Sequence, residues 1–113
     1  MITGFYKNYE YCINQYSVGK GELVNSWYCA YVKVDKDRFT YEEIENMEVH
    51  GGITFTGYKD FNGERVYCIG WDYNHCFDID IKKGLFSNIW INDKEGINKI
   101  IQEIKDFIER YLV

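Results

Sequence analysis

The chain has 113 residues, a formal net charge of −5 and no proline. This length fits one domain, residues 1–113, and the lack of proline excludes collagen-like segments and proline-rich linkers. The negative charge argues against general binding to nucleic-acid backbones, which requires a basic surface. No apolar run is long enough to span a membrane, and the first residues lack the pattern of a secretory signal. The four cysteines have no short paired spacing, so we expect reduced thiols in a cytoplasmic protein.

Two strands are predicted in the first third of the chain. Alternation from Tyr9 through Ile13 predicts the first, and Gly19-Lys20-Gly21 predicts a turn after it. Residues 27–34 are rich in aromatic and β-branched side chains and predict the second strand. The two faces of this strand carry Tyr28, Ala30, Val32 and Val34 on one side and Trp27, Cys29, Tyr31 and Lys33 on the other.

The middle of the chain is predicted to form a short helix and a β-hairpin. Thr40 and Glu43 match a capping box, which favours a helical turn over residues 41–46. Strands are predicted at 47–57 and 65–73, joined by Asn62-Gly63, the pair typical of a type I′ turn. The resulting register pairs Asp60 with Arg65, Tyr58 with Tyr67, Thr54 with Trp71 and His50 with His75.

This register divides the hairpin side chains between two faces. The apolar face is predicted to be core and carries Val49, Ile53, Phe55, Val66 and Cys68. The aromatic and polar face is predicted to bind a ligand and carries His50, Thr54, Thr56, Tyr58, Asp60, Arg65, Tyr67, Ile69, Trp71 and Tyr73. Gly51-Gly52 favours a bulge, and a bulge would reverse the facing of every residue beyond it.

The last third of the chain is predicted to contain a hairpin and a long helix. Alternation between Phe77 and Trp90 predicts the hairpin. Residues 95–112 predict an amphipathic helix, with Asn92 and Glu95 as a start resembling a capping box. Its apolar stripe, which we expect to pack on the sheet, is Ile97, Ile100, Ile101, Ile104, Phe107, Ile108, Tyr111 and Leu112. The predicted fold class is therefore α+β, an antiparallel sheet of meander and hairpin strands with the C-terminal helix packed on one face.

Nine residues of the hairpin region are candidates for binding a ligand: His50, Gly51, Gly52, Thr54, Arg65, Trp71, Asp72, Tyr73 and His75. The aromatic side chains could stack on a flat ring, and Arg65 or Arg38 could hold a phosphate. Gly51-Gly52 precedes strand-like sequence rather than a helix, which excludes a P-loop but allows a ligand to approach the bare backbone. The competing interpretation is that these aromatic residues pack beneath neighbouring elements.

The cysteines and histidines raise the question of reactive sites. A zinc site at Cys68, His75 and Cys76 is not predicted, because structural zinc sites use closely spaced ligand pairs on a knuckle; no metal and no cofactor are expected. If one of the cysteines is a nucleophile, the chain is a small hydrolase that acts on a nucleotide-type substrate. The candidate residues of its catalytic site are Cys68 or Cys76 as nucleophile, His50 or His75 as base, and Asp72 or Asp78 as the group that orients the imidazole. A free cysteine in a strand is more often a small buried apolar residue, so no catalytic residue is predicted.

Several segments resemble a family of small, mostly uncharacterised proteins encoded by bacteriophages and prophages. The family pattern includes an HGG[LI]T[YF] strand, matched by residues 50–55, and a strand that ends in G-[FW]-D-x-x-H, matched by residues 70–75. Residues 29–32, residues 41–44 and the helix from Glu95 match further segments, so that the resemblance covers about two-thirds of the chain. The chain departs from the pattern in lacking prolines at 35–40 and in having a short acidic insertion after the second histidine.

The resemblance implies a phage-type binding protein in the cytoplasm of an infected bacterial host. The expected function is inhibition of bacterial anti-phage defence, either by sequestering a nucleotide signal or by blocking a defence protein such as a CRISPR effector. The expected partner is accordingly a host defence protein or a small nucleotide signal, and the sequence is also compatible with a homo-oligomer. A non-enzymatic function is favoured, with the small hydrolase as the alternative.

Overall fold

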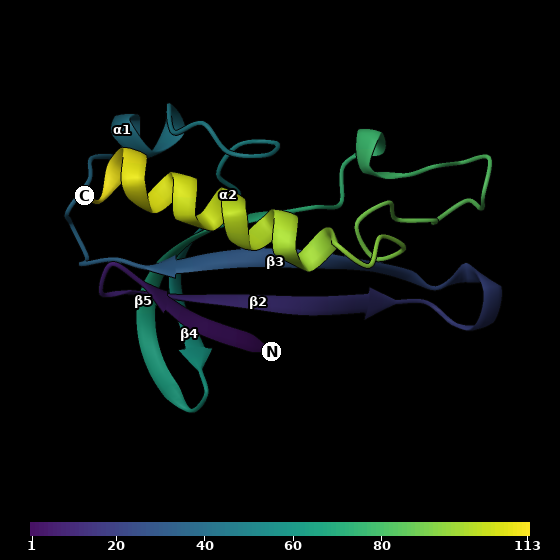
Figure 1. Ribbon diagram of the computed structural model, residues 1–113, viewed down its shortest axis with the longest axis horizontal. Helices are drawn as coiled ribbons and strands as arrows, with labels where there is room; N and C mark the ends of the chain where they lie inside the picture. The colour runs from purple at the N-terminus through teal and green to yellow at the C-terminus, as the bar shows by residue number, and fades with distance from the viewer.

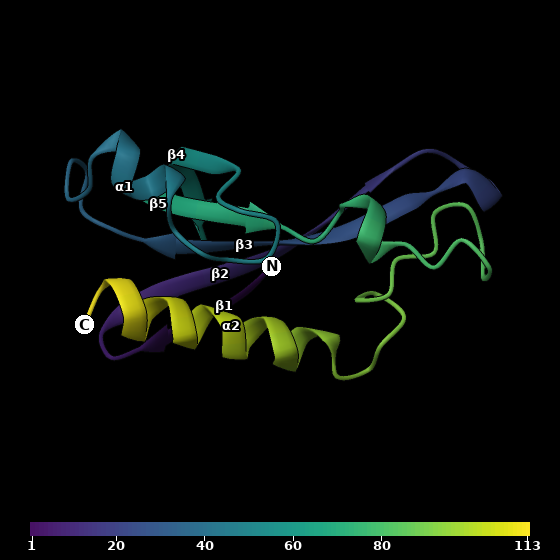
Figure 2. The ribbon, with the colours of Figure 1, turned by 90° about the horizontal axis from the view of Figure 1, so that it is seen from above.

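The computed structural model describes residues 1–113, apart from the side chain of Glu22. Five strands form one antiparallel sheet in the order β1-β2-β3-β5-β4, and the long helix α2 lies along one face of it (Figures 1 and 2). This arrangement confirms the predicted α+β class. The elements are β1 (Ile2–Tyr6), β2 (Tyr9–Val18), a 3-10 turn (Gly21–Leu23), β3 (Asn25–Lys33), α1 (Tyr41–Glu45), β4 (Phe55–Phe61), β5 (Glu64–Asp72), a 3-10 turn (Cys76–Asp78) and α2 (Gly96–Tyr111).

The main core lies between α2 and the sheet. Alternate residues of the central strands point toward the helix, as the period of two in a strand requires. The buried members of this core include Ile13, Ala30, Val32, Ile69, Trp71 and Tyr73 from the sheet side and Ile100, Ile104, Phe107 and Ile108 from α2. The predicted helical stripe is therefore confirmed as the packing face of α2.

A smaller apolar cluster occupies the opposite face of the sheet. Its buried members are Cys12, Cys29, Tyr31, Phe61, Val66 and Cys68. Val66 and Cys68 are thus buried as predicted, but the face that carries Trp71 is the one covered by α2. The prediction that this aromatic face is open for ligand binding is wrong for Trp71 and Tyr73, because both side chains are almost completely buried.

The hairpin of β4 and β5 follows the predicted register. Asn62 and Gly63 have φ values of 52° and 88°, as a type I′ turn requires. Asp60 pairs with Arg65 and Tyr58 pairs with Tyr67. The pairing continues to the backbone amide of Thr54, which donates to the carbonyl of Gly70 at 3.0 Å before the chain leaves the sheet.

Two predicted extended segments are not strands. Residues 47–54 form a turn, in which Gly51 and Gly52 have φ values of 72° and 83° and the Gly52 amide donates to the Val49 carbonyl at 2.9 Å. Glycine adopts such positive φ angles readily, whereas a regular strand excludes them. The hairpin predicted at 77–90 is present only as a chain reversal without strands, in which a single antiparallel bridge joins Ile79 and Asn88.

The helix starts differ in how well they were predicted. Thr40 and Glu43 form the expected capping box of α1, with hydrogen bonds of 3.1 and 2.9 Å. The capping box predicted at Asn92 and Glu95 is wrong, since α2 begins at Gly96 and its N-cap residue, Glu95, makes no capping hydrogen bond with its side chain. Instead, Asp93 accepts hydrogen bonds from the Glu95 amide and the Lys99 ammonium group. Within the part of the chain that the structure describes, neither helix combines the length and the apolar composition needed to cross a bilayer.

Candidate functional site

A buried carboxylate, Asp78, forms the centre of the most polar cluster in the interior. It is 1% exposed and lies in the 3-10 turn that follows β5. Its Oδ1 accepts a hydrogen bond from the Trp90 indole at 2.7 Å and lies 2.7 Å from His50 Nε2. Its Oδ2 accepts from the backbone amide of His75 at 2.9 Å and lies 3.1 Å from His75 Nδ1. One carboxylate therefore joins both imidazoles of the chain.

Hydrogen bonding keeps this carboxylate ionised. Burial by itself raises the pKa of Asp78, because a charged group loses its hydration. The hydrogen bonds from the His75 amide and the Trp90 indole act in the opposite sense and hold the pKa below its ordinary value. Asp78 thus carries a negative charge at neutral pH and accepts hydrogen bonds from the His75 amide and the Trp90 indole.

Aromatic packing holds the two imidazole rings in place. His50 stacks on Tyr73, with ring centroids 4.6 Å apart, and meets Trp90 edge-on at 5.3 Å. His75 stacks on Phe77 at 5.0 Å, with the two rings nearly parallel. The other ring nitrogen of His75, Nε2, lies 3.7 Å from a carboxylate oxygen of Asp72. Each imidazole therefore has one nitrogen on Asp78 and a ring face on an aromatic side chain.

Glu103 of α2 connects this cluster to the main core. Its Oε1 accepts hydrogen bonds from the Tyr73 hydroxyl and, at 3.1 Å, from the Trp71 indole. Its Oε2 accepts from the backbone amide of His50 at 3.2 Å. Burial raises the pKa of Tyr73, so its hydroxyl stays protonated and donates. The helix thereby positions both the turn at 47–54 and the end of β5.

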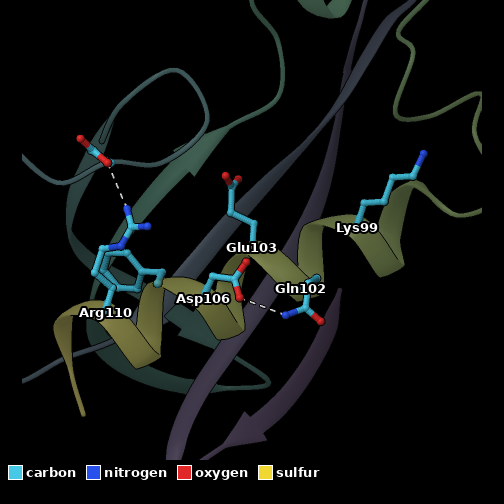
Figure 3. Close-up of a pocket in the computed structure, with 7 residues that line it drawn as sticks. Lys99, Gln102, Glu103, Asp106 and Arg110 are labelled. Carbon is cyan, nitrogen blue, oxygen red and sulfur yellow. Dashed lines mark hydrogen bonds and ion pairs between the residues drawn. The ribbon is translucent and has the colours of Figure 1, made fainter.

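A groove lined by α2 and by Glu48 of the turn at 47–54 borders Glu103 (Figure 3). The side chain of Glu103 points away from those of Gln102 and Asp106, which hydrogen-bond to each other. Arg110 pairs with Glu48 at 3.1 Å at one end of the groove. Its volume is ≈ 240 Å³, below the roughly 300–1,000 Å³ of most small-molecule sites. The charges that line it are of both signs, so it does not have the character of an anion pocket.

The structure brings together only part of the predicted ligand-binding set. His50, Gly51, Tyr73 and His75 meet around Asp78, and Asp72 lies at the edge of this group. Trp71 lies beneath α2, whereas Thr54 lines a separate hollow beside α1. Arg65 is exposed next to the hairpin turn and lies six positions before Trp71 along β5, which corresponds to about 20 Å of strand. The prediction that Arg65 belongs to the same site is therefore wrong.

Of the two cysteines considered as nucleophiles, one lies far from the imidazoles and one lies beside them. Cys68 is buried in the cluster on the other face of the sheet, and burial raises the pKa of its thiol to about 12. Such a thiol is a poor nucleophile and is remote from both imidazoles, so the candidate role of Cys68 is wrong. Cys76 is exposed and adjacent in sequence to His75.

Sequence reasoning named Asp78 only as one of two groups that could orient an imidazole, and it missed Trp90 and Glu103. The spacing Asp72-x-x-His75-x-x-Asp78 is the one signal that links these three residues before the structure is known. Trp90 and Glu103 come from a loop and a helix distant in sequence, and neither carries a local motif. Their contacts depend on how α2 and the 79–95 segment fold back.

Gly51 and Gly52 offer a matched test of how His75 is held. Both have positive φ, which is unfavourable by about 1–2 kcal/mol for a residue with a side chain. A Cβ at Gly51 would also overlap the His75 ring, whereas a Cβ at Gly52 would meet nothing within 4 Å. We expect Gly51→Ala to destabilise the protein by about 1–3 kcal/mol more than Gly52→Ala, as measured by urea unfolding. Equal losses of unfolding free energy in the two variants would contradict the close packing of Gly51 on His75. An NMR signal of the His75 imidazole that is unshifted in Gly51→Ala would contradict it as well.

Comparison with models of protein families, with characterised proteins and with solved structures shows no match for the chain.

Proposed function

We propose that this chain is a non-enzymatic inhibitor of bacterial anti-phage defence, acting in the cytoplasm of an infected host by binding and blocking a defence protein. The supporting observation is a group of exposed apolar side chains in the segment from Phe77 to Ile89. Phe77, Ile81 and Leu85 are 63%, 70% and 60% exposed. Exposed apolar side chains that gather in one region are typical of protein-binding surfaces.

This loop surface, defined by Phe77, Ile81, Leu85, Phe86 and Ile89, lies at the end of the molecule opposite the C-terminus (Figure 1). Leu85 and Phe86 also line a hollow shared with Val24 from the turn between β2 and β3. The loop is joined to the rigid cluster around Asp78 through Phe77, which stacks on His75. A partner protein would therefore contact apolar side chains of which one, Phe77, is held by its stacking on His75.

The charge around the imidazoles supports blocking of a protein rather than sequestering of a nucleotide. The side chains that contact or approach the two rings include the carboxylates of Asp72 and Asp78. The phosphates of a nucleotide would be repelled by these groups, whereas phosphate sites are usually built from arginine, lysine or backbone amides. Arg65, the cation predicted to hold a phosphate, is at the far end of the hairpin.

The test is a phage plating assay in bacteria that each carry one defined defence system. We expect the chain to restore plating on at least one strain, and Ile81→Ser with Leu85→Ser to abolish this effect. The same double substitution should weaken binding to the purified defence protein by about 10-fold or more, because exposed apolar anchors dominate such interfaces.

The matched control is Phe5→Ser with Val113→Ser, which removes two exposed apolar side chains at the other end of the molecule. This control should retain full activity. The proposal fails if the loop variant inhibits defence as well as the parent chain. It also fails if a cyclic nucleotide or ADP-ribose-type signal raises the unfolding temperature by several degrees, since this would indicate sequestering of the signal.

A small hydrolase is the second candidate function. It is supported by His75, whose Nδ1 lies 3.1 Å from a buried carboxylate, as in an oriented general base, and whose side chain is 24% exposed. Turnover of a nucleotide-type substrate that disappears in both His75→Ala and Cys76→Ala would favour this function over the inhibitor.

A further inference from the structure

Three groups that commonly bind metal ions converge beside the 3-10 turn at Cys76–Asp78. The ligand atoms of His50, His75 and Asp78 all lie within 4.8 Å of one another. Two imidazole nitrogens and one carboxylate oxygen are a donor set that zinc uses when three protein ligands leave one position open. We propose that His50 Nε2, His75 Nδ1 and the Asp78 carboxylate bind one zinc ion.

The spacing of these atoms is close to that of ligands around one ion. With zinc–ligand bonds of about 2.0–2.1 Å in a tetrahedron, neighbouring ligand atoms are about 3.3 Å apart. The separations here are 2.7 Å from His50 Nε2 to Asp78 Oδ1 and 3.1 Å from His75 Nδ1 to Asp78 Oδ2. The ligand atoms of His50 and His75 lie within 4.8 Å of each other, so this third pair closes by at most about 1.5 Å around an ion.

The tautomer of His75 that zinc binding requires has a carboxylate beside its protonated nitrogen. A ligating nitrogen must be unprotonated, so each neutral ring carries its proton on the other nitrogen. In His75 that nitrogen is Nε2, which lies 3.7 Å from the Asp72 carboxylate. A carboxylate behind a ligating histidine is a recurrent feature of zinc sites, because it fixes the tautomer and raises the basicity of the ring.

The ligands are also held in position before any ion binds. Trp90 donates to Asp78 at 2.7 Å and fixes the orientation of the carboxylate. Tyr73 and Phe77 stack on the rings of His50 and His75. Such support reduces the loss of conformational freedom on binding, which favours affinity.

The donor set distinguishes zinc from the alkaline-earth ions. Magnesium and calcium take oxygen ligands almost exclusively, whereas imidazole nitrogens suit zinc and other late transition metals. The thiol of Cys76 is exposed and adjacent to His75, so its participation is a separate outcome that the experiment distinguishes.

The test is calorimetric titration of the full-length, chelator-treated protein with zinc chloride, together with thermal unfolding. We expect one zinc ion per chain, a rise of several degrees in the unfolding temperature, and no such response to magnesium. Asp78→Asn and His75→Gln should each weaken zinc binding by about 100-fold or more. Trp90→Phe keeps the ring but removes the N–H donor, and should weaken binding by about 10- to 100-fold.

The matched controls are Asp80→Asn, two residues beyond the proposed ligand, and Cys76→Ser. Both should bind zinc with the affinity of the parent chain. The site is overturned if the folded parent chain, checked by circular dichroism, binds no stoichiometric zinc. It is also overturned if Trp90→Phe and the folded ligand variants keep the parent affinity, or if Cys76→Ser alone loses binding. Trp90→Phe keeps the aromatic packing, so it provides a readout even where Asp78→Asn fails to fold.

Discussion

Replacing Asp78 with alanine is expected to lower the free energy of unfolding by about 3–5 kcal/mol, the range found when one member of a buried ionic network is removed. The carboxylate is 1% exposed, and its loss leaves the Trp90 indole and the His75 amide without their buried acceptor. Urea unfolding at pH 7 measures the change. Asp106→Ala removes an exposed carboxylate of α2 and should stay within about 0.5 kcal/mol. Similar losses in the two variants would show that Asp78 has no special structural role.

The lowered pKa of Asp78 also predicts how the free energy of unfolding depends on pH. The pKa of Asp78 is lowered by folding, so the unfolded chain binds a proton more readily at this group. The stabilisation by Asp78 is therefore complete above its unfolded pKa of about 3.9 and is lost as the pH falls through the lower folded pKa. We expect the stability difference between the parent chain and Asp78→Ala to be constant near neutral pH and to narrow below about pH 4. A difference that grows on acidification would contradict the sign of the shift.

Replacing Ile104 with alanine is expected to lower the free energy of unfolding by about 2–5 kcal/mol. Ile104 is completely buried at the middle of α2, where its side chain belongs to the main core. The truncation removes apolar contact area and leaves a cavity that the sheet and helix cannot fully close. The measurement is the urea midpoint at an unchanged denaturant slope.

Ile81→Ala is the matched control, because it removes the same atoms from an exposed side chain. Its effect should lie within about 0.5 kcal/mol. An equal loss in the two isoleucine variants would mean that α2 does not pack on the sheet as described. A smaller denaturant slope for Ile104→Ala would instead indicate that the two-state transition has broken down.

The elements with strong local signals were predictable from the sequence. Asn62-Gly63 specifies a turn with two positive φ angles, and the period of α2 identifies its buried stripe. The hairpin register also placed His50 near His75, and their ring centroids are 5.6 Å apart. They meet through the Gly51-Gly52 turn rather than through a strand pair, because both glycines take φ values that a strand excludes.

Features that depend on the path of the chain in space were not predictable. Both faces of the hairpin carry apolar residues, so alternation alone cannot tell which face α2 covers. Trp71 and Tyr73 were consequently expected at a binding surface, although Glu103 satisfies their polar atoms beneath the helix. The segment from Phe77 to Trp90 alternates like a strand, yet it folds around the buried Asp78 instead. A charged residue at the centre of a loop has no signature in the hydrophobic pattern.

The position of β5 has a consequence for how the protein is made. The central strand β3 pairs with β5, and β4, which precedes β5 in the chain, lies at the edge of the sheet. The pairing of β5 with β3 and β4 cannot form until synthesis has passed Asp72. The apolar face of the sheet stays uncovered until α2 leaves the ribosome. Such long-range pairing slows folding and exposes aggregation-prone strands meanwhile. The growing chain is therefore expected to expose the apolar face of the sheet from the synthesis of β2 until α2 has been made.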